Sequence, residues 1–336
     1  MKKQNKNSSS GNTLAFLQIN NSCNQKCVFC NRPPGVKCKQ NYEEEDTKNR
    51  IKELSKNKNI STVVFTGGET LLSSNLPELI KLAKKYNFKT EIQTNGTLLH
   101  TQINELKKAG LDKINFALHS HKKDISDKLR GTNIGFEKIN ENLVLASKMG
   151  FDIHIIHVIT SANFQDLPEF IESLHDLNLN KFWLNFSLVV PECWAWENKW
   201  IIPRYKEVKP FLIEALELCD KYYIRFDVSE IVPLCLIEGF EEHAISPTFK
   251  FADIEIIDDA GSEIIKLDHL NPGEINASKA PQCLECKLNQ VCAGFYPRMK
   301  EQFGAEDFIP FKGDSTTILK RLNKKNSVCI LRKEAK

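Results

Sequence analysis

Short apolar runs alternate with amphipathic stretches through the first part of the chain. The runs have the length of strands, and each amphipathic stretch has apolar positions spaced for one face of a helix. Strands are predicted at residues 14–19, 62–65, 90–93, 113–118, 152–159 and 182–189, and helices at 43–55, 76–86, 101–109, 136–149 and 167–177. Strands alternating with helices are typical of parallel strands joined by helical crossovers. The pattern predicts an α/β fold, a partial (β/α)6 TIM-like barrel, with its functional face at the C-terminal ends of the strands.

The pattern changes after residue 200. Residues 205–222 have the pattern of one long helix, 224–228 of a strand, and 254–258 with 263–267 of a β-hairpin around the turn at 259–262. We therefore predict three parts of the chain. They are a disordered, basic and polar tail over residues 1–11, an α/β core domain over 12–200 and a small C-terminal domain over 201–336.

The composition is that of an ordinary globular protein, with 336 residues, 41% hydrophobic and 26% charged. A net charge of +3 and the lack of an aromatic-rich basic patch argue against nucleic acid as a partner. No apolar stretch approaches the roughly 20 residues that span a bilayer, and the first residues lack the apolar core of a secretory signal. The sequence predicts a cytoplasmic protein with no membrane partner.

Eleven cysteines are many for a chain of this length. In a reducing compartment, clustered cysteines are more often metal ligands or catalytic groups than disulfides. Two groups lie near opposite ends of the chain: Cys23, Cys27 and Cys30, and Cys283, Cys286 and Cys292. The grouping predicts two metal sites.

The first group has the spacing C-x3-C-x2-C and follows the first predicted strand. Three thiolates on one such loop can bind three irons of a [4Fe–4S] cluster, whereas ordinary clusters of this type have four cysteine ligands. The fourth iron is then open to another ligand, such as the amino and carboxylate groups of a methionine-like molecule. A structural zinc loop is the alternative, although zinc sites usually combine C-x2-C pairs with distant ligands.

The segment from Cys23 to Cys30, with the aromatic Phe29 before the last cysteine, resembles the radical S-adenosylmethionine (SAM) superfamily. The resemblance covers residues 12–200 and implies a [4Fe–4S] cluster that binds SAM. In that superfamily one electron from the cluster cleaves the sulfonium and gives a 5′-deoxyadenosyl radical, which abstracts a hydrogen atom from the substrate. The resemblance also implies an electron donor, such as a flavodoxin or a ferredoxin.

Further residues match cofactor-binding positions of that superfamily. Gly67-Gly68-Glu69 matches its GGE segment, in which glycines allow close backbone approach and a carboxylate pairs with the ammonium of the ligand. Thr70 stands where the superfamily usually has proline. By resemblance, the cofactor-binding residues are Phe29, Gly67, Gly68, Glu69, Thr70, Thr94, Asn95, Ser120 and Arg130. For Arg130, a solvated position on a helix is the alternative.

The second group has the spacing C-x2-C-x5-C, and Cys235 precedes the predicted hairpin. Together they supply four thiolates, a full set for an iron–sulfur cluster or for structural zinc. The segment over residues 225–310 resembles the auxiliary-cluster extensions named SPASM and twitch. The resemblance implies one auxiliary cluster of the [4Fe–4S] type, which could accept an electron, ligate substrate or brace the domain.

Cys193 follows the sixth predicted strand, where a thiol at the barrel opening could donate a hydrogen atom to a substrate radical; a partly buried small residue is the alternative. Radical enzymes with SPASM-like extensions often modify ribosomal peptides. The resemblance therefore implies peptide maturation by crosslinking, thioether formation or epimerisation. A small-molecule substrate from cofactor biosynthesis is the first alternative, and a non-catalytic binding module held by zinc or a cluster is the second.

Overall fold

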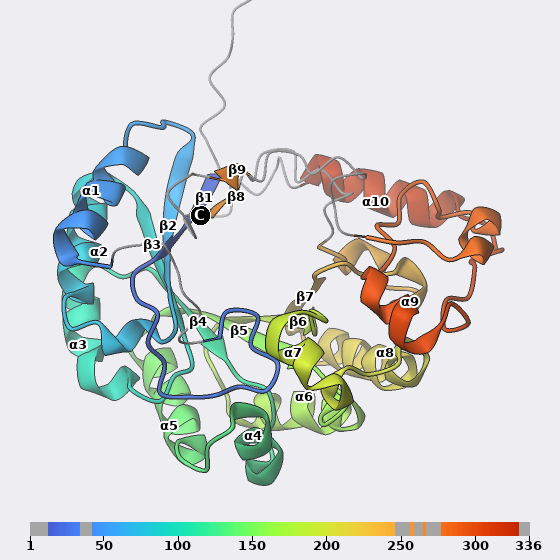
Figure 1. Ribbon diagram of the computed structural model, residues 1–336, viewed down its shortest axis with the longest axis horizontal. Coiled ribbons are helices and arrows are strands. Elements are labelled where there is room, and N and C mark those ends of the chain that lie inside the picture. The colour runs from blue at the N-terminus through green and yellow to red at the C-terminus, as the bar shows by residue number, and fades with distance from the viewer. Residues whose placement is uncertain (1–12, 34–41, 246–255, 259–264, 267–276, 329–336) are drawn as a thin grey trace, which may run out of the picture.

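A nine-stranded sheet dominates the computed structural model of the protein, in which residues 13–33, 42–245, 256–258, 265–266 and 277–328 are described. Its strands are β1 (Thr13–Gln18), β2 (Ile60–Thr66), β3 (Lys89–Thr94), β4 (Lys113–Ala117), β5 (Asp152–Ile159), β6 (Phe182–Leu188), β7 (Arg225–Ser229), β8 (Ile256–Asp258) and β9 (Ile265–Lys266). They lie in the order β7-β6-β5-β4-β3-β2-β1-β8-β9, and every pair except β8 with β9 is parallel. Because β7 and β9 are the two edges of a curved sheet, the barrel is open (Figure 1).

Helices cover the convex side of the sheet (Figure 1). Those that do are α1 (Glu44–Leu54), α2 (Leu76–Lys85), α3 (Leu99–Ala109), α4 (Lys123–Arg130), α5 (Phe136–Lys148), α6 (Leu167–Asp176) and α8 (Tyr205–Lys221). The short α7 (Cys193–Glu197) follows β6, and α9 (Pro297–Phe303) and α10 (Thr316–Val328) belong to the C-terminal part. Each parallel crossover runs through at least one helix, since the chain must return to the same end of the sheet. In the part of the chain that the structure describes, no helix has the length and apolar character needed to cross a membrane.

The two faces of the sheet differ in burial. Along β5, Ile153, Ile155 and Ile159 are buried, whereas the alternate residues His154 and Ile156 are only partly buried. Successive side chains of a strand point to opposite faces, so one face of β5 lies under the helices and the other faces the inside of the open barrel. The hydrophobic core therefore lies between sheet and helices, and the inner face of β5 carries the less buried side chains, both the polar His154 and the apolar Ile156.

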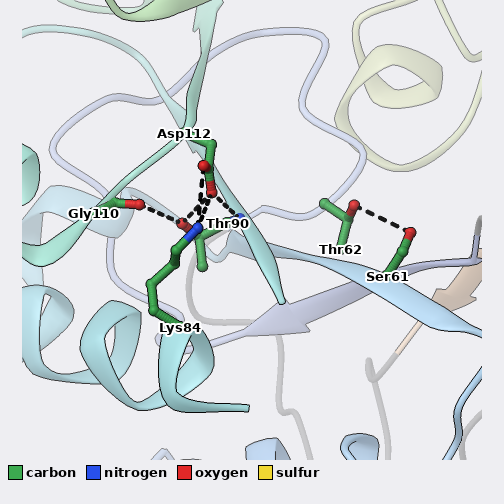
Figure 2. A network of polar contacts seen from close by, with 6 residues as sticks. All are labelled: Ser61, Thr62, Lys84, Thr90, Gly110 and Asp112. Atoms are coloured by element: carbon green, nitrogen blue, oxygen red, sulfur yellow. Dashed lines mark hydrogen bonds and ion pairs between the residues drawn. The ribbon is translucent and has the colours of Figure 1, made fainter. Parts of the chain in front are cut away.

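A polar network ties the strands together at the edge opposite the cysteine loop (Figure 2). Asp112, just before β4, accepts the backbone N–H of Thr90 at 2.7 Å, the Thr90 hydroxyl at 3.1 Å and the Lys84 ammonium at 2.8 Å. The Thr90 hydroxyl also lies 3.3 Å from the Gly110 carbonyl. These contacts join the end of α2 to the starts of β3 and β4, which stabilises the base of the barrel.

The predicted barrel is confirmed, and its sheet extends beyond the six predicted strands to β7 on one side and to β8 and β9 on the other. All six predicted strands are present at nearly the predicted bounds, and β7, which the prediction placed in the C-terminal domain, pairs with β6 and continues the sheet. The prediction missed α4 because this helix has only 8 residues, of which Ile125 and Leu129 alone are apolar. The predicted hairpin is present as β8 and β9, and the remainder of 254–267, like the predicted tail, lies outside the described residues.

Polar contacts tie the C-terminal part to the barrel. Arg204, before α8, donates two hydrogen bonds to the Asp307 carboxylate, at 2.8 and 3.3 Å. Arg298 of α9 donates to the Pro191 carbonyl at 3.0 Å, and its guanidinium lies 4.8 Å from the centre of the Trp196 ring. The segment after β6 is therefore held between the barrel and the C-terminal helices.

Candidate functional site

The cysteine loop follows β1 and packs tightly against the loop after β2. Gly68 and Glu69 donate backbone hydrogen bonds to the carbonyls of Asn20 and Ser22, at 3.3 and 2.7 Å. A Cβ at Gly68 would lie 2.2 Å from the Ser22 oxygen, and one at Gly67 would lie 2.8 Å from the Asn20 oxygen. Glycine is required at both positions because no side chain fits between the two loops.

The Glu69 carboxyl is buried between the loops after β2 and β3. One oxygen accepts hydrogen bonds from the Thr94 hydroxyl at 2.6 Å and the Leu71 N–H at 3.0 Å, and the other accepts the Asn95 N–H at 2.7 Å. Burial raises the pKa of this carboxyl, and the same donors oppose the shift. The structure thus brings the predicted Glu69, Thr94 and Asn95 together, with Glu69 joining the loops after β2 and β3.

Arg130, the last residue of α4, is 1% exposed, so the alternative of a solvated helix position is wrong. Its guanidinium donates to the Gln25 side chain at 2.9 Å, to the Ser126 hydroxyl at 3.2 Å and to the Ala117 carbonyl at 2.5 Å. The Arg130 carbonyl accepts the Lys26 N–H at 3.0 Å. The end of α4 therefore also holds the cysteine loop.

The residues between the first two cysteines are fixed by contacts that sequence reasoning missed. Asn24 accepts a hydrogen bond from the Asn95 side chain at 2.8 Å and donates one to the Thr97 hydroxyl at 2.9 Å. Gln25 is 3% exposed and faces Arg130. In the sequence, Asn24 and Gln25 occupy unspecified positions of the C-x3-C motif, and their polar character between two ligands is the one signal that could have found them.

The thiols of the loop are partly buried and lie close enough to one another for their charges to interact. Burial raises the pKa of Cys27 to about 12; the Arg130 charge opposes the shift, and Cys30 and Cys23 add to it. Burial also raises the pKa of Cys23 and Cys30. A bound metal centre would hold all three as thiolates, since coordination deprotonates a thiol outright.

The remaining predicted cofactor residues flank this loop. Phe29 stands edge-on to His119, with ring centroids 4.8 Å apart. Ser120 is buried, and its hydroxyl accepts a backbone N–H two residues further along the chain at 2.9 Å. Thr70 points to β3, where its hydroxyl donates to the Gln93 carbonyl at 2.5 Å. Thr70 therefore ties the loop after β2 to the neighbouring strand β3.

Cys193, the first residue of α7, comes close to the first cysteine group. Trp194 donates its backbone N–H to the Cys30 carbonyl at 3.3 Å, and Cys193 itself is exposed. Its charge adds to the effect of burial in raising the pKa of Cys30. Its backbone φ of 45° is in the left-handed region, which residues other than glycine seldom adopt. The alternative of a partly buried small residue does not describe it.

The structure brings the second cysteine group together with Cys235. One cavity is lined by the four cysteines Cys235, Cys283, Cys286 and Cys292. Backbone N–H groups point at two of their sulfurs: Leu234 and Gly294 lie 3.5 and 3.3 Å from that of Cys292, and Phe311 lies 3.3 Å from that of Cys286. In iron–sulfur proteins, hydrogen bonds to the sulfurs help to set the reduction potential of the cluster.

Most of the remaining cavity wall is apolar, and it includes Leu288, Phe295 and Phe308. Gly294, with φ of 93°, lets the wall close, because a Cβ there would lie 2.2 Å from the Ser278 oxygen. Within the described residues, no three His, Cys, Asp or Glu side chains are arranged to hold a single metal ion. The four cysteines thus lie around the wall of a cavity and do not converge on one point.

Residues 17–174 match the sequence model of the radical SAM superfamily. The chain carries a radical SAM domain. Over 170 residues it is 31% identical to the probable GTP 3′,8-cyclase of Sulfolobus acidocaldarius, and 28% identical to that of Saccharolobus solfataricus. Each match covers 50% of this chain and 54% of the relative, so the chain spans about half the length of these curated relatives.

Two solved structures resemble the radical SAM domain together with the C-terminal part. SuiB of Streptococcus suis, bound to SAM, has a TM-score of 0.63 at 14% identity, with 90% of this chain and 76% of that chain covered. The structure titled anSMEcpe with bound AdoMet has a TM-score of 0.62 at 16% identity, with 95% and 98% covered. At this identity the likeness establishes the shared fold, an open α/β barrel.

A radical SAM domain implies a [4Fe–4S] cluster with bound SAM, and the residues present fit that group. Cys23, Cys27 and Cys30 would hold the cluster. The buried side-chain nitrogen of Gln25 has no hydrogen-bond partner among the described residues. A donor left over between two of the cysteines fits a site built around a further group.

Proposed function

We propose that this protein is a radical SAM enzyme that cleaves SAM reductively and abstracts a hydrogen atom from a substrate at the mouth of the open barrel. The observation that carries the proposal is the clamped cysteine loop. The backbone of Gly68 and Glu69 and the side chain of Arg130 hold it at the C-terminal end of β1. When bound, the cluster supplies one electron to SAM, which gives a 5′-deoxyadenosyl radical.

The surrounding residues would orient the cofactor and keep water out. Arg130 holds a positive charge beside the thiols, which favours their thiolate form. Phe29 and the buried His119 form a dry wall beside the last cysteine. Exclusion of water protects a radical from side reactions.

For the second group we propose an auxiliary [4Fe–4S] cluster with Cys235, Cys283, Cys286 and Cys292 as ligands. Four thiols around one cavity supply a ligand for every iron. No iron would then be open to substrate. The cluster would therefore transfer electrons or brace the C-terminal part.

As substrate we propose a peptide. The two structures whose fold matches 90% or more of this chain, C-terminal part included, were also solved with peptides: SuiB with the precursor peptide SuiA, and anSMEcpe with the Cp18Cys peptide. A nucleotide such as GTP is the second candidate, because the cyclase relatives share half of this chain. For an epimerisation, the exposed Cys193 beside Cys30 would be the hydrogen donor.

The experiment is anaerobic reconstitution with iron and sulfide, followed by reduction with dithionite, a flavodoxin or a ferredoxin in the presence of SAM. Formation of 5′-deoxyadenosine is expected, and Cys27→Ala should abolish it. Absence of this product, together with bound zinc and no absorbance from an iron–sulfur cluster, would contradict the proposal. Deuterium transfer from a labelled peptide or labelled GTP into 5′-deoxyadenosine then separates the two substrate classes.

A further inference from the structure

Three cations near the cysteine loop lie on tryptophan rings instead of on carboxylates. The Lys128 ammonium is 4.7 Å from the centre of the Trp200 ring. The Lys199 ammonium and the Arg298 guanidinium are 4.0 and 4.8 Å from the centre of the Trp196 ring. None of the three has an ion pair among the described residues. An aromatic ring attracts a cation without neutralising its charge, so these positive charges remain available to a partner.

The elements that carry these cations bind the cysteine loop directly. Trp194 of α7 donates its backbone N–H to the Cys30 carbonyl at 3.3 Å, and the Asn198 side chain donates to the Val28 carbonyl at 3.2 Å. The Val28 N–H in turn donates to the Leu129 carbonyl of α4 at 3.0 Å. A partner bound to α4 and to the segment after α7 would therefore lie close to the first cysteine group.

The unpaired charges around this loop are mostly positive. Lys26, on the loop itself, is exposed and has no ion pair in the part of the chain that the structure describes. Asp127 of α4 is paired with Lys123 at 2.5 Å. Asp124 of α4 and Glu197 of α7 are exposed carboxylates of these helices. Because the unpaired cations outnumber these two carboxylates, the surface attracts an acidic partner.

Trp200 adds an apolar contact to this basic surface. Its side chain is 48% exposed, although tryptophan is on average among the more buried residues. Tryptophan and arginine are enriched among the residues that contribute most to protein–protein binding. An exposed tryptophan among unpaired cations is therefore typical of a surface that binds an acidic protein.

We propose that Lys128, Lys199 and Trp200 form the docking surface for an electron-carrier protein whose redox centre is surrounded by carboxylates. This inference deepens the proposed function and rests on its reductive step. In that step the carrier is oxidised by one electron and the cluster of the first cysteine group is reduced by one, with no proton or bond transferred. The contacts of both elements with the cysteine loop keep the path for this electron short.

Binding is measured first, by calorimetric titration of the cluster-loaded protein with an oxidised flavodoxin and, separately, an oxidised ferredoxin. The double variant Lys128→Glu/Lys199→Glu should weaken binding about tenfold, because two attractive charges become repulsive. Trp200→Ala should also weaken binding, through loss of its apolar contact. Wild-type binding should weaken as the salt concentration rises, since salt screens exposed charges.

The double variant Lys287→Glu/Lys312→Glu is the matched control. It makes the same change of charge on two exposed lysines beside the second cysteine group, and it should bind both carriers as the wild type does. Loss of binding in this control alone would place the docking surface at the second group and overturn the proposal.

Formation of 5′-deoxyadenosine is the second measurement. With dithionite, a small reductant that needs no docking surface, Lys128→Glu/Lys199→Glu should form this product at the wild-type rate. With a subsaturating amount of reduced flavodoxin, the rate should fall about tenfold. The proposal is overturned if the wild type binds neither carrier, or if this variant binds them as the wild type does. Since dithionite bypasses docking, failure here is distinct from failure of the proposed radical chemistry.

Discussion

The Arg130 guanidinium donates a hydrogen bond to the side-chain oxygen of Gln25 at 2.9 Å, although 105 residues separate them. The same oxygen lies 3.7 Å from the Cys27 sulfur. One buried arginine at the end of α4 therefore sets the position of the residue between the first two cysteines. The predictions below follow from contacts of this kind.

Arg130→Lys is expected to lower the free energy of unfolding by about 1–3 kcal/mol. The single ammonium of lysine cannot serve the acceptors on Gln25, Ser126 and Ala117 at once, so buried acceptors lose their donor. Urea unfolding followed by circular dichroism measures the change. Arg225→Lys, at an exposed position, is the control and should change stability by less than about 0.5 kcal/mol. Equal effects of the two substitutions would contradict the anchoring role of Arg130.

Gly68→Ala is expected to lose iron at the first site, because its Cβ would lie 2.2 Å from the Ser22 oxygen and force the two loops apart. Iron and sulfide per chain after anaerobic reconstitution measure the loss. Gly150→Ala is the matched control: it has φ of 71° but nothing within 4 Å of an added Cβ. The control should cost about 1 kcal/mol of backbone strain and keep its iron. Full iron content in Gly68→Ala would show that the close approach of the loops is not needed.

Cys286→Ala is expected to remove the auxiliary cluster alone, and Cys27→Ala the first cluster alone, so each variant should keep about half of the iron. Iron analysis and electron paramagnetic resonance of the reduced proteins distinguish the two centres. Cys219→Ala is the control, since Cys219 is buried in α8 and should leave both signals unchanged. Loss of all iron from Cys286→Ala would contradict two independent sites.

The buried His157 should make the free energy of unfolding decrease as the solution becomes more acidic. Burial lowers the pKa of its imidazole to about 3, although a hydrogen bond to the Leu118 carbonyl opposes the shift. Between this value and the ordinary 6.5, the unfolded chain binds a proton that the folded protein does not. Unfolding free energy should therefore decrease as the pH falls below 6.5.

Urea unfolding at several pH values between about 5.5 and 7.5 checks this dependence. His157→Asn should flatten the slope, because it removes one of the buried groups that take up a proton only on unfolding. His175→Asn, at an exposed position, should keep the slope of the wild type. An unchanged slope in His157→Asn would rule out this contribution.

The sequence by itself determined the local features of this protein. Alternating strand and helix patterns placed β1 to β6 and most of the helices, because strand and helix periods are properties of neighbouring residues. The spacing of Cys23, Cys27 and Cys30 predicted the radical SAM domain that residues 17–174 match, since these three cysteines lie on one loop. A short polar helix such as α4 has too few apolar positions to be recognised in this way.

Tertiary structure alone decided which distant residues meet. It buried Arg130 against Gln25 and brought Cys193 beside Cys30. It also joined β7 to the barrel and set Glu230 next to Tyr296. Each of these contacts spans many residues of chain and depends on how the whole sheet curves, so no local pattern in the sequence encodes it. The position of the cysteine loop on the chain is thus a property of sequence, whereas the burial that surrounds its thiols is a property of the fold.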